Sequence, residues 1–148
     1  MELMSGERAN PEDTLLLGAE LIKPVFSKHD FEFGYSRKGK GSGGEFASAE
    51  FRRGDRRFEF HFRYSLGLVR YHIGAKSISH QEYMCSVLGK PHLSNYPGFS
   101  KDPLDAFKDL RLDLESYCGE FLGGTDDALL HRIEDGRARW ASQPRLPD

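Results

Sequence analysis

The sequence predicts an α+β fold, a four-stranded antiparallel β-meander with helices packed on one face, in the order α-β-β-β-β-α-α-α. Three observations lead to this prediction. Residues 58–64 alternate aromatic side chains with Glu, His and Arg, which is the two-residue period of a half-buried strand. Turns containing glycine separate this stretch from neighbouring strand-like stretches between 31 and 73. Apolar residues at helical spacing precede and follow the meander.

The first helix is expected from Asn10 to about Lys28. Asn10 is a favourable N-cap, Pro11 suits the first turn, and acidic residues follow near the positive end of the helix dipole. Pro24 lies inside the pattern and is expected to bend the helix or end it early, because proline lacks a backbone donor. The buried stripe of this helix consists of Leu15, Ala19, Ile22 and Phe26.

Four strands are expected at about 31–37, 45–52, 58–64 and 68–73, with tight turns at Gly54 and Gly67. Register is constrained by parity, because a slip of one residue would exchange the two faces of the sheet. The expected pairs place apolar residues opposite one another. They are Phe33 with Ala49, Phe51 with Phe58, Ala49 with Phe60, Ala47 with Phe62, Phe60 with Ile73, Phe62 with Tyr71, and Tyr64 with Val69.

Helices are expected to complete the chain. Residues 79–82 form a capping box that begins a short helix, and Gly89 can end it. The longest helix is expected over 102–122, with an apolar stripe and two glycines as its stop. Thr125 or Asp126 is expected to cap a last helix.

Size and composition favour a single domain over 1–148, with frayed tails at 1–9 and 141–148. A chain of 148 residues with 38% hydrophobic content can bury roughly two thirds of its unfolded surface. The two cysteines, Cys85 and Cys118, lie in apolar patterns and are expected to be buried thiols, which favours a reducing, cytoplasmic location. We expect no membrane association, because no apolar run approaches the length of a span.

The balance of charge gives no general reason for binding nucleic acid. Lys and Arg number 21 and Asp and Glu number 23, for a net charge of -2. The aromatic residues face the predicted core, so a stacking platform for single-stranded nucleic acid is not expected. The charge is nevertheless uneven, since residues 37–63 hold eight basic and four acidic residues and residues 102–122 hold six acidic and two basic ones. The acidic helix is interpreted as a solvated face, with a surface for a basic partner as the alternative.

The outward face of the predicted sheet contains the candidate site. Neighbouring carboxylates there should raise one another's pKa unless a positive group lies between them. Carboxylates with imidazoles suit a divalent cation, and arginines suit an anionic group. The expected cross-strand rows are Glu32, Glu50 and Glu59, then Ser48, His61 and His72, and then Phe46, Arg63 and Arg70.

Three interpretations of this face stay open. One is a site in which Glu32, Glu50, Glu59, His61 and His72 bind a divalent metal, although no cofactor is required by the sequence. In the same interpretation a small ligand would contact Arg63, Arg70, Ser48 and Phe46. The simplest is a solvated sheet face, which is usual for one-sided antiparallel sheets. The third is a face covered by another protein or by a second copy of this chain.

No familiar catalytic motif occurs in the sequence. It contains no His-Glu-x-x-His, no Cys-x-x-Cys and no Gly-x-Ser-x-Gly pattern, so support is lacking for zinc peptidases, redox folds and ordinary serine hydrolases. Whether the protein is an enzyme is left open, with the balance toward a non-enzymatic role.

The order of the elements resembles that of small uncharacterised bacterial α+β domains, some of which are similar to immunity proteins of toxin systems. The resemblance covers about residues 10–122: a leading helix with Leu21-Ile22-Lys23-Pro24, an aromatic-rich meander, and closing helices that include 102–107. It contains no diagnostic motif and assigns no residue a role. It implies a non-enzymatic binding function, so the leading hypothesis is a cytosolic protein-interaction module. A homodimer through the outer sheet face or an edge strand is a further hypothesis.

Overall fold

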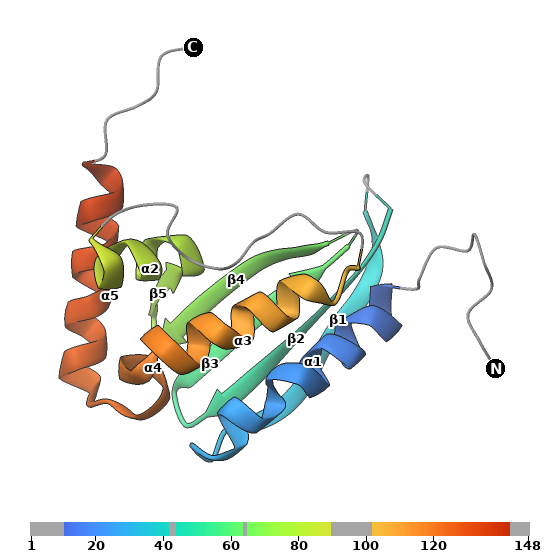
Figure 1. The fold of residues 1–148 in the computed structure, drawn as a ribbon, viewed down its shortest axis with the longest axis horizontal. Coiled ribbons are helices and arrows are strands. Elements are labelled where there is room, and N and C mark those ends of the chain that lie inside the picture. Colours follow the sequence, from blue (N-terminus) through green and yellow to red (C-terminus); the bar gives the residue numbers. More distant parts are fainter. Residues whose placement is uncertain (1–10, 42–43, 64, 90–101, 143–148) are drawn as a thin grey trace, which may run out of the picture.

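A computed structural model describes residues 11–41, 44–63, 65–89 and 102–142 (Figure 1). The described residues form an α+β structure with an antiparallel sheet, as the sequence predicts. The strands are β1 (Glu32–Gly41), β2 (Gly44–Arg53), β3 (Arg56–Phe62), β4 (Leu66–Ile73) and β5 (Lys76–Ser79). The helices are α1 (Pro11–Ser27), α2 (His80–Leu88), α3 (Asp105–Tyr117), α4 (Gly119–Gly123) and α5 (Asp126–Ala141).

The sheet is a meander in the order β1-β2-β3-β4-β5, one strand more than predicted. The additional strand, β5, has four residues and pairs with β4 after a turn at Gly74, whose φ of 57° is left-handed. A strand this short shows too few alternations for its period to stand out in the sequence. It leads directly into α2, so the prediction of a helix start at Ser79 is correct and the strand before it was missed.

The helix boundaries follow local capping chemistry. Ser79 and Glu82 form both hydrogen bonds of the predicted capping box, and Gly89 ends α2 with a φ of 74°. Thr125 caps α5 by accepting from the backbone N–H of Ala128. The prediction of one continuous helix over 102–122 is wrong. The helix is divided into α3 and α4 at Cys118, whose φ of -103° and ψ of 29° depart from helical values.

The register is confirmed between β2 and β3 and wrong on either side of them. Phe58 lies opposite Phe51 as predicted. Phe33 also lies opposite Phe51, two residues from its predicted partner. Phe60 lies opposite Val69, four residues from its predicted partner, because β3 and β4 are joined at 63–65 and Gly67 lies within β4 rather than in the turn.

The displacements of Phe33 and Phe60 are even, so these two residues stay on their predicted face. Register shifts between Tyr35 and Arg37 and between Phe60 and Phe62 change the parity of the pairing beyond them. In the β3–β4 ladder Phe58 lies opposite Tyr71 and Phe62 lies opposite Leu66, instead of Phe62 opposite Tyr71. The predicted pair of Tyr64 with Val69 falls on Tyr64, outside the described residues. The predicted tail at 1–9 also lies outside them, as does the predicted tail at 141–148 except for Ala141, which ends α5, and Ser142.

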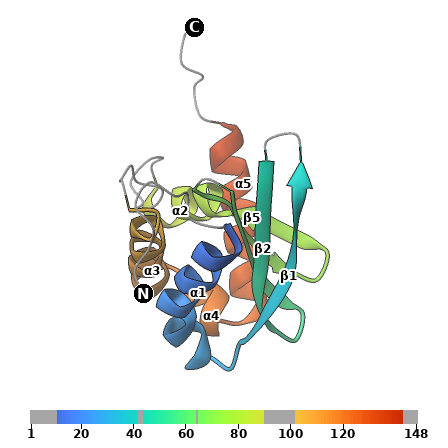
Figure 2. The same ribbon diagram turned by 90° about the vertical axis from the view of Figure 1, so that its right-hand side faces the viewer.

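One face of the sheet is covered by helices and the other is open. Figure 2 shows α1, α3 and α4 on the same side of the sheet, with β1 and β2 bordering the opposite side. The rings of Phe58, Phe60 and Phe62 face the helices and are at most 3% exposed. The ring of Phe26 on α1 stacks on that of Phe51 with centroids 4.4 Å apart. The aromatic residues of the meander therefore form the core, as the alternation predicts.

Two glycines allow the helices to approach closely. A Cβ at Gly18 of α1 would lie 2.5 Å from the ring of Phe107 on α3. A Cβ at Gly136 of α5 would lie 2.5 Å from the carbonyl oxygen of Glu82 on α2. Both helix pairs thus depend on glycine at the contact, because a Cβ atom there would collide with the neighbouring helix.

The described part of the chain contains no helix long and apolar enough to cross a membrane. Cys85 and Cys118 are buried thiols that form no disulfide bond with each other, as predicted.

The β2–β3 hairpin is joined to the α4–α5 turn by a buried arginine. Arg56 is 4% exposed, and its guanidinium donates to three backbone carbonyl oxygens, those of Glu120, Phe121 and Gly124, at 2.7 to 3.0 Å. It also contacts the carboxylate of Asp126 at 2.9 Å. The carbonyls of Phe121 and Gly124 lie at the end of α4, where helical donors run out, and Arg56 supplies donors to them.

We predict that Arg56→Ala lowers the free energy of unfolding by about 3 kcal/mol, because buried carbonyls lose their charged donor. Urea unfolding monitored by circular dichroism measures this. Arg52→Ala is the matched control, because Arg52 is 58% exposed and its ion pair with Glu50 is worth about 0.5 kcal/mol. Equal losses in the two variants would contradict the structural role of Arg56.

Candidate functional site

The candidate site is a charged network on the open face of the sheet. It lies where the outward positions of β2, β3 and β4 adjoin. Glu50 lies opposite Glu59, and Glu59 lies opposite Arg70. In the next row Arg57 lies between Arg52 and His72. The alternation of β3 places Arg57, Glu59 and His61 on this face together, because Phe58, Phe60 and Phe62 occupy the other.

Glu59 is the centre of the network. Its Oε1 accepts from Nε2 of His72 at 2.7 Å, and its Oε2 accepts from Nε2 of His61 at 2.7 Å. Both carboxylate oxygens are therefore engaged by imidazoles from two strands. Glu59 is 21% exposed and His72 is 18% exposed, so the contacts are only partly open to solvent.

Arg57 separates the two carboxylates. Its Nη1 lies 3.4 Å from Oε1 of Glu50 and 3.7 Å from Oε1 of Glu59. Its Nη2 lies 3.5 Å from Nδ1 of His72. Because an arginine N–H can only donate, Nδ1 faces it as an acceptor, and the proton of neutral His72 lies on Nε2 and is donated to Glu59. Arg57 thus places a positive charge between these two neighbouring carboxylates.

The network shifts the pKa values of two of its members, Glu59 and His72. Burial acts to raise the pKa of Glu59, but hydrogen bonds and charge from His61 and His72 outweigh it and hold this pKa below the ordinary 4.5. Burial lowers the pKa of His72 below the ordinary 6.5, and the positive charges of Arg57 and Arg70 lower it further against the opposing effect of Glu59. The favoured state is an ionised Glu59 beside a neutral His72.

The predicted metal-binding set is brought together only in part. Glu50, Glu59, His61 and His72 belong to the network, whereas Glu32 lies at the sheet edge opposite Arg52. His72 lies opposite Arg57 and not in the predicted row with Ser48 and His61. Within the described ranges, no group of three or more His, Cys, Asp or Glu side chains is arranged to hold a metal ion. The metal site stays a prediction.

The predicted ligand-binding residues are also dispersed. Ser48 lies opposite His61 but is only 2% exposed, which removes it from contact with a ligand. The guanidinium of Arg63 lies over the ring of Phe46 at 5.7 Å, so their predicted neighbourhood is confirmed. Arg70 lies apart from them, opposite Glu59, and donates to Ser77 of β5 at 3.0 Å. The missed strand β5 and the displaced β3–β4 register account for this difference.

A hollow of about 420 Å³ adjoins the network at the edge of the sheet. It forms where Gly34 lies opposite Glu50, since a glycine contributes no side chain to the outward row. Three carboxylates and two arginines line it. The lining consists of Asp30, Glu32, Phe33, Gly34, Glu50, Arg52, Arg53 and Gly54.

A second polar cluster, missed from the sequence, is enclosed in the core. The hydroxyl of Tyr71 lies 2.7 Å from Nδ1 of His80 and 3.4 Å from Sγ of Cys118. His80 Nε2 contacts Oδ2 of Asp113 at 2.8 Å. All four residues are 0% exposed, and burial raises the pKa of Cys118 to about 12, so this thiol is not a solvent-accessible nucleophile. The cluster satisfies buried polar groups.

Comparison with protein-family models finds no match to this chain, and comparisons with curated proteins and with solved structures find none either.

We predict that the protein loses stability on acidification in two steps that the network explains. A lowered histidine pKa means that the unfolded chain binds the proton more readily, so the contribution of His72 is complete above about pH 6.5 and is lost as pH falls toward its folded pKa. The contribution of Glu59 is complete above about pH 4.5 and is lost as pH falls through its own lowered pKa. Urea unfolding from about pH 8 down to about pH 2 measures both, because the Glu59 step lies below pH 4.5.

Variants separate the two steps. His72→Gln should flatten the pH dependence just below about pH 6.5, while Glu59→Gln should lower stability at neutral pH by about 1 to 2 kcal/mol, because one imidazole N–H then faces an amide donor. His131→Gln, on an exposed position of α5, is the control for removing one histidine. An unchanged profile in His72→Gln would contradict the assignment.

Proposed function

We propose that this protein is a non-enzymatic protein-binding module and that its partner binds the open face of the sheet. The observation behind this proposal is the one-sided architecture, in which the aromatic face packs on helices while an extended charged face has no covering element in the described chain. The resemblance in layout to immunity-protein-like domains supports the same class of function. The two buried cysteines, which form no disulfide bond with each other, favour a reducing, cytoplasmic setting.

The network gives this face fixed charges. Glu59 is oriented by two imidazoles, and Arg57 contacts both Glu50 and Glu59. Side chains that are already ordered lose less conformational entropy when a partner binds. They also impose a pattern of charge that a partner must match, which contributes to specificity more than to affinity.

The hollow beside the network favours a basic side chain of the partner. Among the described residues, neither Asp30 nor Glu32 forms an ion pair, although both carboxylates line the hollow. Of the two arginines in the lining, Arg53 donates to the carbonyls of His29 and Leu122, and Arg52 pairs with Glu50. The lining carries three carboxylates against two arginines, so its net charge is negative. A lysine or arginine entering the hollow would complement it.

We predict that Glu32→Lys weakens capture of a protein partner at least tenfold. The introduced lysine would repel the lysine or arginine that the partner places in the hollow. The measurement is affinity capture from native lysate with the immobilised full chain, quantified by mass spectrometry and followed by cross-linking of the recovered partner. Cross-links should reach β1 and β2.

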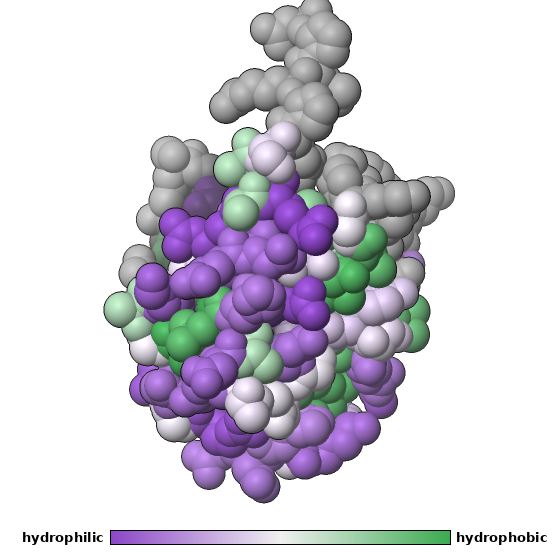
Figure 3. Space-filling view, turned by 90° about the vertical axis from the view of Figure 1, so that its left-hand side faces the viewer, coloured by the Kyte–Doolittle hydropathy of each residue, from purple (hydrophilic) through white to green (hydrophobic). Residues whose placement is uncertain are grey.

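Glu134→Lys is the matched control, because it makes the same change of charge at an exposed position of α5. The face around α5 is largely hydrophilic, with only small separate hydrophobic patches (Figure 3). Recovery of the same partner by the wild-type chain and by Glu134→Lys, but not by Glu32→Lys, is the expected result. Failure to recover any reproducible partner, or equal recovery by Glu32→Lys, would refute the proposal.

A metal or small-ligand site is the second candidate function. It is favoured by the convergence of two imidazole Nε2 atoms on Glu59, both at 2.7 Å. The guanidinium of Arg57, 3.7 Å from the same carboxylate, opposes it because a divalent cation would be repelled.

Isothermal titration of the purified protein with zinc and with manganese tests this second candidate. If the site exists, saturable binding should disappear in His72→Gln and persist in His131→Gln. Absence of saturable heat in the wild-type protein would remove the candidate without bearing on the capture experiment.

A further inference from the structure

A second surface, separate from the open sheet face, lies between α1 and β1. It is a groove of about 580 Å³. Leu16 is 36% exposed and Leu17 is 58% exposed, so two large apolar side chains face solvent side by side. Contiguous apolar surface of this kind marks interaction sites. The lining consists of Asp13, Leu16, Leu17, Ala19, Glu20, Lys23 and Phe33.

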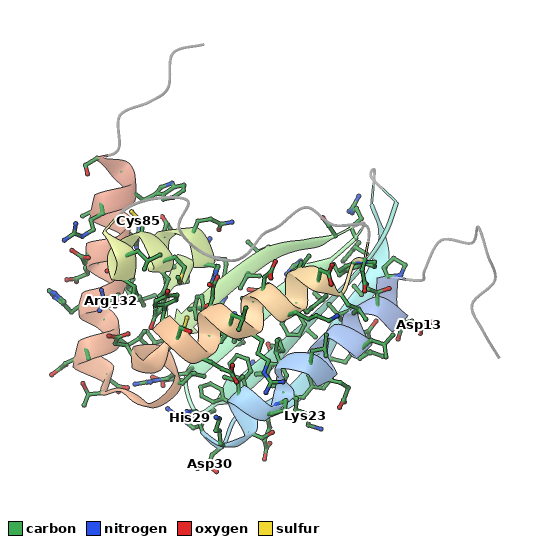
Figure 4. All side chains as sticks on the ribbon, viewed as in Figure 1. Asp13, Lys23, His29, Asp30, Cys85 and Arg132 are labelled. Atoms are coloured by element: carbon green, nitrogen blue, oxygen red, sulfur yellow. The ribbon has the colours of Figure 1, made fainter. Side chains whose placement is uncertain are left out.

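The exposed positions of α1 follow one stripe along the helix. Residues 13, 16, 17, 20 and 23 recur at intervals of three and four, and all are exposed. Asp13 lies at one end of the stripe and Lys23 at the other (Figure 4). The ten residue steps from Asp13 to Lys23 correspond to about 15 Å along the helix. Along the groove, Asp13 is therefore followed by two leucines, then by a second acid, Glu20, and last by Lys23.

This arrangement is self-complementary under a two-fold axis. If two α1 helices pair antiparallel with the axis near residue 18, Asp13 of each chain meets Lys23 of the other. Leu17 then lies close to the axis and contacts its counterpart, and Leu16 adds to the apolar centre. The dimer would thus contain two ion pairs between the chains and would bury four leucines, two from each chain. We propose that the occupant of this groove is a second copy of the chain.

Helix pairing through the groove is favoured over strand pairing at the edge of the sheet. β1 is an edge strand, but its register with β2 shifts between Tyr35 and Arg37. An irregularity of this kind twists an edge strand and opposes continuation of the ladder into another chain. The proposed dimer therefore differs from the edge-strand and outer-face dimers expected from the sequence. It leaves the charged face of both copies uncovered.

The size of the groove sets the expected affinity. A standard specific interface buries about 800 Å² on each partner, and one helical stripe with part of a strand falls toward the lower end of the range. We expect a dimer that dissociates on dilution, with a dissociation constant of about 10 µM.

Sedimentation equilibrium of the full chain over a wide concentration range tests the inference with a charge-swap series. Asp13→Lys and Lys23→Asp should each weaken dimerisation at least tenfold, because each places like charges together at both ends of the interface. The double variant Asp13→Lys/Lys23→Asp restores opposite charges in the dimer and should return the dissociation constant to within about threefold of the wild-type value.

Leu17→Glu should abolish the dimer, and Leu112→Glu is its control, because Leu112 of α3 is 51% exposed and lies outside the groove. Circular dichroism verifies that every variant is folded. A wild-type chain that stays monomeric throughout would overturn the inference. A dimer unaffected by Leu17→Glu, or single charge variants not rescued by the swap, would overturn it equally. None of these outcomes bears on partner capture by the open face.

Discussion

The burial of the aromatic side chains of β3 against the helices is the constraint on which the rest of the structure depends. Phe58, Phe60 and Phe62 pack inward, so the residues between them must face outward. The position of Glu59 and His61 on one surface is thus a consequence of core packing, and not of any interaction between them. The network forms because Arg57 and the neighbouring strands then supply complementary groups to the carboxylate.

The same constraint explains which parts of the fold could be predicted from the sequence. Alternation identifies the buried face of a strand whatever its register, which is why the faces were predicted correctly while two registers were not. Gly67 resembles a turn residue but lies within β4, and no local signal distinguishes the two uses. Capping chemistry is local, so Ser79 and Thr125 were predicted well. The break at Cys118 depends on tertiary packing and has no such signal.

The candidate site was predictable where it depends on neighbours along one strand. The positions of Glu59 and His61 follow from alternation within β3, whereas that of His72 requires the exact β3–β4 pairing. The buried cluster around Tyr71 joins groups from β4, α2 and the α3–α4 region, at sequence separations of 9 and 47 for its hydroxyl contacts. Such long-range contacts leave no periodic pattern. The pairing of Tyr71 with Cys118 therefore becomes visible only in the folded chain.

The two proposed surfaces differ in the physics that each offers a partner. On the open face most charges already have partners within the chain, so the incompletely matched carboxylates at the hollow, with Glu32 nearest the network, are where another molecule gains most. In the α1–β1 groove the leucines are exposed to water, and burying them would drive dimerisation. Asp13 and Lys23 would fix the relative orientation of the two chains. Apart from Phe33, which lines both, the groove and the hollow beside the network are formed by different residues, so a dimer would present two copies of the charged face. A partner with two binding sites would then contact both faces of one dimer. Its overall affinity would exceed its affinity for one face, because the second contact forms at a high effective concentration.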